Sequence, residues 1–199
     1  MIFKILSMSA FMLIFSSDRV FAHDHHSSLS NAKGIMSIDS VFNLDSTWTD
    51  QDGHSFRIGA LKGSPSLVAM AYTKCESSCP LIVEDMKKIG SGLAAKAKTA
   101  PSIKFVLFSF DTKRDTPSRL KAFAKDRKLN LDQWVLLQGT KKSVRDLAAV
   151  LGIRFKEDSN GEFDHSNVIS LLDSEGVIRN QQLRLDQKPD EMTARIVDL

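Results

Sequence analysis

The chain has 199 residues, of which 42% are hydrophobic and 26% charged, and its formal net charge at pH 7 is +3. This length suits one well-formed core and is short for two domains. Lys and Arg are scattered among Asp and Glu rather than gathered into a basic patch, so we expect no nucleic-acid partner.

Residues 1–22 have the pattern of a secretory signal peptide. Lys4 supplies a short positive region, an apolar run follows, and Ala22 is a small residue suited to cleavage. The run is shorter than the roughly 20 apolar residues of a membrane span. The alternative is an uncleaved N-terminal anchor, and only in that case would the chain contact a membrane. Because the pattern is that of a signal peptide, we expect export to the periplasm, where two thiols tend to form a disulfide unless they are reduced or metallated.

Residues 23–33 form a His-rich tail that we expect to be flexible. If cleavage follows Ala22, His25 becomes the third residue of the mature protein. An imidazole at that position can bind Cu(II) or Ni(II) together with the amine and two amides. We prefer the plainer interpretation of a polar tail that binds metal weakly or not at all, because the site depends on where the cut falls.

Residues 34–199 are expected to form a single domain. Residues 41–44 and 55–58 flank a turn cluster at 50–53 and predict an N-terminal hairpin. The remaining elements predicted in chain order are strands at 67–71, 103–110, 134–137 and 153–156, helices at 81–97, from Pro117 and at 144–151, a hairpin of 168–172 with 177–179, and a last helix from Pro189. Alternating strands and helices predict an α/β fold, a largely parallel sheet with helices on both faces.

The only two cysteines, Cys75 and Cys79, lie where an apolar strand gives way to a helix. A helix N-terminus favours a thiolate, so cysteines there are reactive. At this spacing the pair can close a disulfide or hold a soft metal ion between two sulfurs, and three intervening residues favour copper over plain disulfide exchange. A structural disulfide is the alternative, although so short a loop stabilises little. Two cysteines do not complete a tetrahedral zinc site, so a further ligand is needed.

His165 is one candidate for that ligand. It precedes the strand at 168–172 and follows Asp164, an acid that can orient an imidazole. From the residues alone, a surface histidine is the favoured interpretation. We assign no role to His54.

Three motifs stand out in the sequence. They are Tyr-Thr-Lys-Cys-Glu-Ser-Ser-Cys-Pro at residues 72–80, Phe-Asp-Thr-Lys-Arg-Asp-Thr-Pro at 110–117, and Asp-His-Ser at 164–166 followed by Leu-Leu-Asp-Ser-Glu-Gly at 171–176. They resemble the motifs of the Sco/SenC family, the copper chaperones that assist assembly of the binuclear copper centre of cytochrome c oxidase. They stand in the family's order, and the resemblance extends from about residue 34 to the C-terminus.

The resemblance implies a thioredoxin-like fold, with a central mixed sheet flanked by helices and added N-terminal and internal hairpins. It implies that Cys75, Cys79 and His165 bind one copper ion, as Cu(I), Cu(II) or both, and that the cysteines also cycle between dithiol and disulfide. Glu76 and Thr112 depart from the family's prolines. The added charge of Glu76 is expected to oppose thiolate formation and to favour a bound cation.

Our leading hypothesis is a periplasmic copper-binding metallochaperone that delivers copper to the binuclear site of cytochrome c oxidase, in subunit II, with a periplasmic copper donor or thiol reductant as a further partner. The alternative is a thiol–disulfide oxidoreductase that reduces the cysteines of the acceptor. A peroxidase is disfavoured because Lys74, not an arginine, stands beside Cys75. For Asp111 and Asp115 we expect a helix cap or a role in ordering the loop.

Overall fold

The structure is a computed structural model that describes residues 37–96 and 98–199. The predicted signal peptide and His-rich tail lie outside the described residues, and so do the first residues of the predicted domain. Within the described part of the chain, no helix combines the length and hydropathy that crossing a bilayer requires.

A seven-stranded mixed sheet forms the centre of the domain, with strand order β2-β1-β5-β4-β3-β8-β9. β3, β4 and β5 run parallel, and the outer strands pair antiparallel. The strands are β1 (Thr47–Asp50), β2 (Ser55–Arg57), β3 (Ser66–Ala71), β4 (Lys104–Ser109), β5 (Trp134–Gly139), β8 (Ile169–Leu172) and β9 (Ile178–Gln182). A separate hairpin joins β6 (Phe155–Glu157) to β7 (Phe163–His165).

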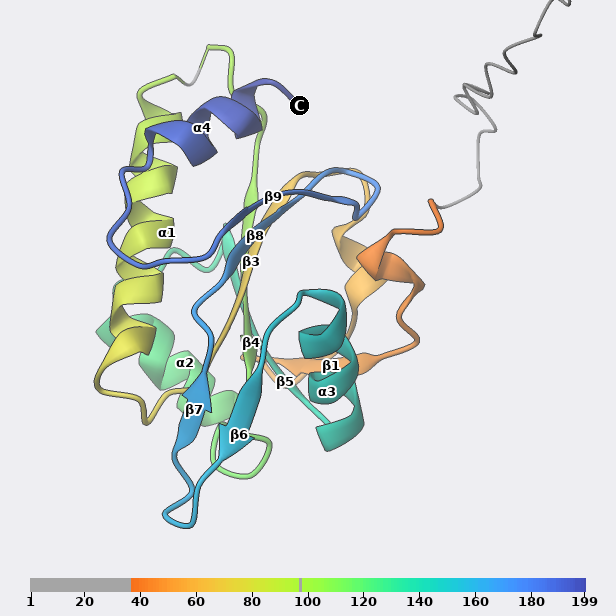
Figure 1. The fold of residues 1–199 in the computed structure, drawn as a ribbon, viewed down its shortest axis with the longest axis vertical. Helices are drawn as coiled ribbons and strands as arrows, with labels where there is room; N and C mark the ends of the chain where they lie inside the picture. The colour runs from red at the N-terminus through yellow and green to blue at the C-terminus, as the bar shows by residue number, and fades with distance from the viewer. Residues whose placement is uncertain (1–36, 97) are drawn as a thin grey trace, which may run out of the picture. The chain divides into compact units, whose positions relative to one another are not determined.

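Helices cover both faces of the sheet, with α1 and α2 on one side and α3 on the other (Figure 1). The helices are α1 (Ser78–Ala94), α2 (Pro117–Asp126), α3 (Lys141–Val150) and α4 (Asp190–Val197), with 3-10 turns η1 (Val41–Asn43) and η2 (Ile58–Leu61). All six residues of β3 are buried, since β4 and β8 flank the strand and helices cover it. An apolar strand of this kind is expected at the centre of a parallel sheet.

Most predicted elements are confirmed, including the three parallel strands, the hairpin of β8 and β9, and the last helix. The N-terminal hairpin is partly wrong. Residues 41–43 form η1, and β1 is the strand that pairs with β2. The Ser40 hydroxyl accepts a hydrogen bond from the Phe42 amide at 3.1 Å, and this local bond favours a turn over an extended strand. The helix predicted at 81–97 begins and ends three residues earlier, at Ser78 and Ala94.

The topology brings three separate loops to one edge of the sheet. Because β3 and β4 are parallel, the segments that follow them leave at the same edge. β8 runs antiparallel to β3, and its first residue, Ile169, pairs with Ala69 near the end of β3. The segment before β8 therefore arrives at the edge from which the cysteine-containing loop departs. Ligands of open α/β sheets commonly bind at such an edge.

Candidate metal centre

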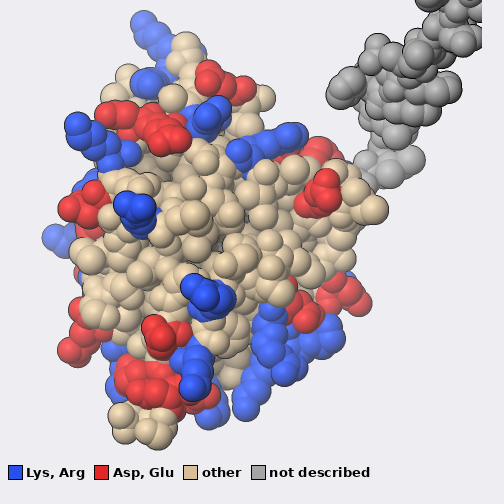
Figure 2. Space-filling model, viewed as in Figure 1, with Lys and Arg blue, Asp and Glu red and all other residues tan. Residues whose placement is uncertain are grey.

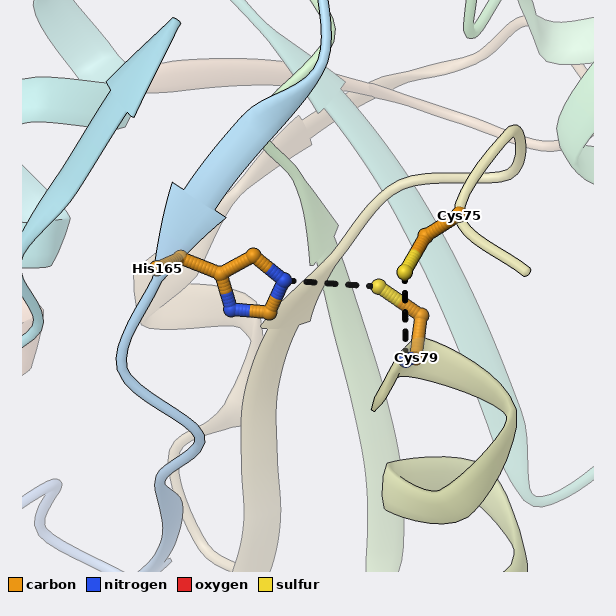
Figure 3. Close-up of side chains that lie close together, drawn as sticks. All are labelled: Cys75, Cys79 and His165. Atoms are coloured by element: carbon orange, nitrogen blue, oxygen red, sulfur yellow. Dashed lines mark hydrogen bonds between the residues drawn. The ribbon is translucent and has the colours of Figure 1, made fainter. Parts of the chain in front are cut away.

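Cys75, Cys79 and His165 lie together at this edge, with one ligand atom from each within 4.8 Å of the others (Figure 3). The cysteines come from the loop after β3 and the first turn of α1, and the histidine comes from the end of β7. Cys79 Sγ lies 3.6 Å from His165 Nε2. Both cysteines are free thiols and buried, while the histidine is partly exposed.

The two cysteines do not share a helix face, contrary to the simplest interpretation of their spacing. Cys75 lies before the helix, in a turn where its amide donates to the Tyr72 carbonyl at 3.3 Å. Cys79 stands in the first turn, and its amide donates to Cys75 Sγ at 3.4 Å. The Tyr72 amide donates to Cys79 Sγ, also at 3.4 Å. Each sulfur thus accepts from a backbone amide, that of the first turn of α1 for Cys75 and that of the residue after β3 for Cys79.

The two sulfurs have opposite electrostatic environments. Hydrogen bonds from the Cys79 thiol and amide, together with that of Ser77, lower the pKa of Cys75 to about 3 despite its burial. The hydrogen bond to Cys75 and burial raise the pKa of Cys79. Any opposing effect of Glu76 is therefore outweighed by these bonds. The pair carries one thiolate, on Cys75, and one thiol that donates to it.

The imidazole of His165 is oriented by a backbone carbonyl. Its Nδ1 lies 3.2 Å from the carbonyl oxygen of Ser166, which can only accept, so Nδ1 carries the proton of the neutral ring. The lone pair of Nε2 then faces the sulfurs, as a metal ligand requires. The expected partnership with Asp164 is wrong, because that side chain is exposed on the alternating strand β7 and Nδ1 instead faces the Ser166 carbonyl.

Asp115 fixes the start of the cysteine loop. Its buried carboxylate accepts hydrogen bonds from the Thr73 amide at 3.0 Å, the Thr73 hydroxyl at 2.5 Å and the Ser109 hydroxyl at 2.5 Å. Burial nevertheless raises the pKa of Asp115. The loop-ordering role expected for this residue is confirmed, and the cap of α2 is Thr116, whose hydroxyl accepts from the Arg119 amide.

Asp111 organises the neighbouring loop. Its carboxylate accepts from the amides of Lys113 and Arg114 at 3.1 and 2.9 Å and pairs with the Arg114 side chain. The Arg114 guanidinium also donates to the Gly161 carbonyl at the tip of the β6–β7 hairpin. Asp111 thus holds a cation that binds the hairpin carrying His165, and it is no helix cap.

Glu162 is a residue near the site that the sequence analysis missed. Its carboxylate accepts from Lys74 Nζ and, at 3.1 Å, from the Tyr72 hydroxyl. The same hydroxyl accepts from the Phe163 amide at 3.3 Å. The bond from Lys74 lowers the pKa of Glu162, whereas burial raises the pKa of Tyr72 to about 12. These contacts fasten the His165 hairpin to the cysteine loop. Lys74 and Glu162, which join the two segments, are 88 residues apart in the sequence.

His54, the other histidine within residues 37–96 and 98–199, does not join the site. His54 lies at the β1–β2 turn, with a side chain that is 77% exposed and an Nδ1 that is 3.4 Å from Asp50. The three histidines of the tail are outside the described residues.

The donor set fits a soft metal ion held by three ligands. Two sulfurs and a neutral imidazole suit Cu(I), zinc and related ions, but a structural zinc site takes four ligands. The group found within the described residues has three. Metal–donor bonds of about 2.0–2.3 Å require only small side-chain movements from donors that already lie within 4.8 Å.

Comparison with known proteins finds Sco-related proteins both by sequence and by structure. The family model described as SCO1/SenC matches residues 37–199. A SCO2-like protein of Rickettsia conorii is 30% identical over 149 residues, which cover 72% of this chain and 69% of that protein. The solved structure of Bradyrhizobium japonicum ScoI with copper bound has a TM-score of 0.63 and 23% identity, over 76% of this chain and 94% of its own. BsSco, described as a member of the Sco family of cytochrome c oxidase assembly proteins, has a TM-score of 0.65 and 23% identity, over 77% and 91% of the two chains. At these identities the solved structures establish the fold, which is thioredoxin-like as expected.

Proposed function

The chain belongs to the SCO1/SenC family, and on that premise we propose that it is a copper-binding metallochaperone. Cys75 and Cys79 supply two sulfurs, and His165 supplies one nitrogen, to a single copper ion. The observation that carries this proposal is the convergence of these three side chains, from segments 86 residues apart, to within 4.8 Å. Copper is present in the solved B. japonicum ScoI, which shares this fold.

The three donor side chains are arranged so that a copper ion can bind and be released to another protein. Cys75 is already a thiolate at neutral pH because its pKa is about 3, so only the Cys79 proton must be displaced. Two sulfurs and one imidazole make a near-trigonal Cu(I) site, and Cu(II) binds with an added ligand. Cys79 is fully buried, whereas His165 is partly exposed. Ligands of an acceptor protein would therefore approach past the histidine.

We further propose that the acceptor is the binuclear copper site in subunit II of cytochrome c oxidase. BsSco, which shares the fold, is described as belonging to a family of cytochrome c oxidase assembly proteins. The pattern of residues 1–22 supports export to the periplasm, and residues 34–199 would act there as one copper-binding domain. A periplasmic copper donor or thiol reductant would complete the cycle.

An anaerobic Cu(I) titration of the reduced protein against a competing chelator tests the copper site. We expect one Cu(I) per chain in the wild type and a rise of at least about 100-fold in Kd for His165→Ala, since changes merely behind a metal ligand already cost about 10–100-fold. His54→Ala is the matched control, because that exposed histidine is remote from the sulfurs. Equal Cu(I) affinity in wild type and His165→Ala would refute the three-ligand site.

A second candidate function is thiol–disulfide exchange, favoured by the unequal pair of cysteines. The Cys75 thiolate would attack a disulfide of the acceptor protein and form a mixed disulfide, and one acceptor sulfur would leave as a thiolate. Cys79, after losing its proton, would then attack Cys75 Sγ and release the second acceptor sulfur. Two electrons pass to the acceptor, and Cys75 and Cys79 become joined by a disulfide.

The environment of Cys75 weighs against reduction as the main role. A strongly lowered thiol pKa stabilises the dithiol form, which makes such a pair a stronger oxidant and a weaker reductant. We expect the Cys75–Cys79 couple to have a reduction potential well above the about −270 mV of thioredoxin. Equilibration with glutathione, read by mass spectrometry, measures it. A potential at or below the thioredoxin value would favour the reductase instead.

A further inference from the structure

A hollow lies beside the metal centre without belonging to it. Three phenylalanine side chains line it, and its volume is about 160 Å³. We call it the aromatic hollow; it is lined by Phe110, Phe155 and Phe163, with Lys113, Lys141 and Arg145 among its polar residues. The Phe110 ring lies 4.8 Å from the His165 ring, centroid to centroid. A molecule seated in the hollow would therefore lie one aromatic ring away from the metal ligand.

The charge around the aromatic hollow is mainly positive. Lys113 pairs with Glu157 at 3.3 Å, but Lys141 and Arg145, both exposed, have no carboxylate within 4.0 Å among residues 37–96 and 98–199. Lys142, next to them in sequence, is paired with Asp146 at 2.6 Å. Lys and Arg side chains gather over α3 in the space-filling view (Figure 2). Two cations thus stand at the hollow without a carboxylate within ion-pair distance among the described residues, and Glu157, which also lines the hollow, is paired with Lys113.

The remaining acidic residue at the aromatic hollow does not cancel this charge. Asp111 is 2% exposed and is engaged by the Arg114 side chain and two backbone amides. Its carboxylate is therefore neutralised within the fold. A ligand that reaches the hollow from solvent meets apolar rings below and the free cations Lys141 and Arg145 beside it.

The dimensions and charge specify the chemistry of an occupant. A cavity of about 150 Å³ lined by apolar side chains holds one benzene ring, so the aromatic hollow has room for a single aromatic side chain. Unpaired cations at an interface attract carboxylates and exclude basic partners. Interfaces commonly combine a buried aromatic anchor with a polar rim.

We propose that the aromatic hollow is the docking site of an acidic segment of the protein that exchanges copper with this chain, with an aromatic side chain of that segment seated on the three rings and flanking carboxylates on Lys141 and Arg145. The proposal rests on the proposed copper function for the identity of the partner. Docking there places the partner beside His165, the partly exposed ligand, which is the side from which copper can leave.

The test is a titration of the isotope-labelled, reduced protein with short peptides, followed by amide chemical shifts. The probe is acetyl-Asp-Phe-Asp-amide, and the controls are acetyl-Lys-Phe-Lys-amide, acetyl-Asp-Ala-Asp-amide and free N-acetylphenylalanine. We expect the probe to bind at least about fivefold more tightly than each control, with the shifts centred on the residues that line the hollow.

Charge variants make the test specific. Lys141→Glu with Arg145→Glu should weaken probe binding at least about tenfold, because two attractive contacts become repulsive. Lys142→Glu is the matched control, since Lys142 lies on the same helix, is paired with Asp146 and does not line the hollow. This control should stay within about twofold of wild type at about 0.15 M salt, where charges more than about 8 Å apart are screened.

Several outcomes would overturn the proposal. Equal binding of the basic peptide, unchanged binding in the double variant, or shifts centred away from the hollow would each do so. N-acetylphenylalanine binding as tightly as the probe would assign the hollow to a small aromatic acid instead. Cu(I) affinity is measured on the same samples and should be unchanged in the double variant. If wild type bound the probe selectively but no Cu(I), the proposed function would fail while the acidic-peptide site remained.

Discussion

Glu162→Ala is the substitution that most directly tests how the proposed copper site is assembled. The Glu162 carboxylate joins the hairpin that carries His165 to Tyr72 and Lys74 in the segment leading to Cys75. Removing it leaves all three proposed ligands in place and breaks two of the contacts that fasten the hairpin to the cysteine loop. The bond from the Phe163 amide to the Tyr72 hydroxyl remains. We therefore expect the affinity for Cu(I) to fall while the fold and the one-to-one stoichiometry stay unchanged.

The size of the expected loss of Cu(I) affinity follows from how exposed the residues bonded to Glu162 are. The side chains of Lys74 and Glu162 are 55% and 37% exposed, so solvent screens their ion pair. Such exposed pairs change an equilibrium constant by a factor of about 1.4 to 5. The hydrogen bond from the mostly buried Tyr72 adds a factor of about 2 to 10. Together they predict a rise of about three- to fiftyfold in the Kd for Cu(I).

The assay is the anaerobic Cu(I) competition titration, repeated from about 0.05 to about 0.5 M NaCl, over which surface charges become screened. The wild type should lose affinity with salt and Glu162→Ala should not. Glu157→Ala is the control on the same hairpin, because Glu157 forms an exposed pair with Lys113 that does not reach the cysteine loop. Exchanging the charges of Lys74 and Glu162 should recover part of the loss. Wild-type affinity in Glu162→Ala, or an equal loss in Glu157→Ala, would refute the reasoning.

Three further predictions concern the site and the core. Iodoacetamide should label Cys75 before Cys79, and the rate at Cys75 should be constant from pH 7 to 5, because a pKa of about 3 keeps Cys75 a thiolate over this range. Cys79→Ala should raise the pKa of Cys75, because it removes a hydrogen-bond donor to that sulfur. Peptide mass spectrometry of the labelled protein at a series of pH values measures both effects. Asp115→Ala should destabilise the fold by about 2–4 kcal/mol, since the Thr73 amide and the hydroxyls of Thr73 and Ser109 lose their acceptor, and an unchanged urea midpoint would contradict this. Gly139→Ala should lower stability by about 1–3 kcal/mol, because its Cβ would lie 2.5 Å from the Trp48 ring, and the same denaturation measures it.

Local patterns in the sequence were sufficient for the elements whose apolar residues repeat clearly. β3 and β4 are short apolar runs of strand length, as expected for strands buried on both faces. The start of α2 was predictable from Thr116 and Pro117, which cap it as a first turn requires. Residues 41–44 were misassigned because an apolar run of four is compatible with either a strand or a tight turn, and the Ser40 hydroxyl decides between them.

The amino-acid sequence was sufficient to predict the two candidate sulfur donors, because both cysteines lie within one short strand-to-helix segment whose geometry is local. It named His165 only through resemblance to a family, since no local pattern distinguishes a ligand from a surface histidine. Tertiary structure decided the rest. The antiparallel pairing of β8 with β3 places His165 at the edge where the cysteines lie. In the folded chain the hydrogen-bond partner of the imidazole is the Ser166 carbonyl and not Asp164. Glu162 and the aromatic hollow arise only when β6, β7 and α3 pack beside the cysteine loop, because their contacts join residues that are far apart in sequence.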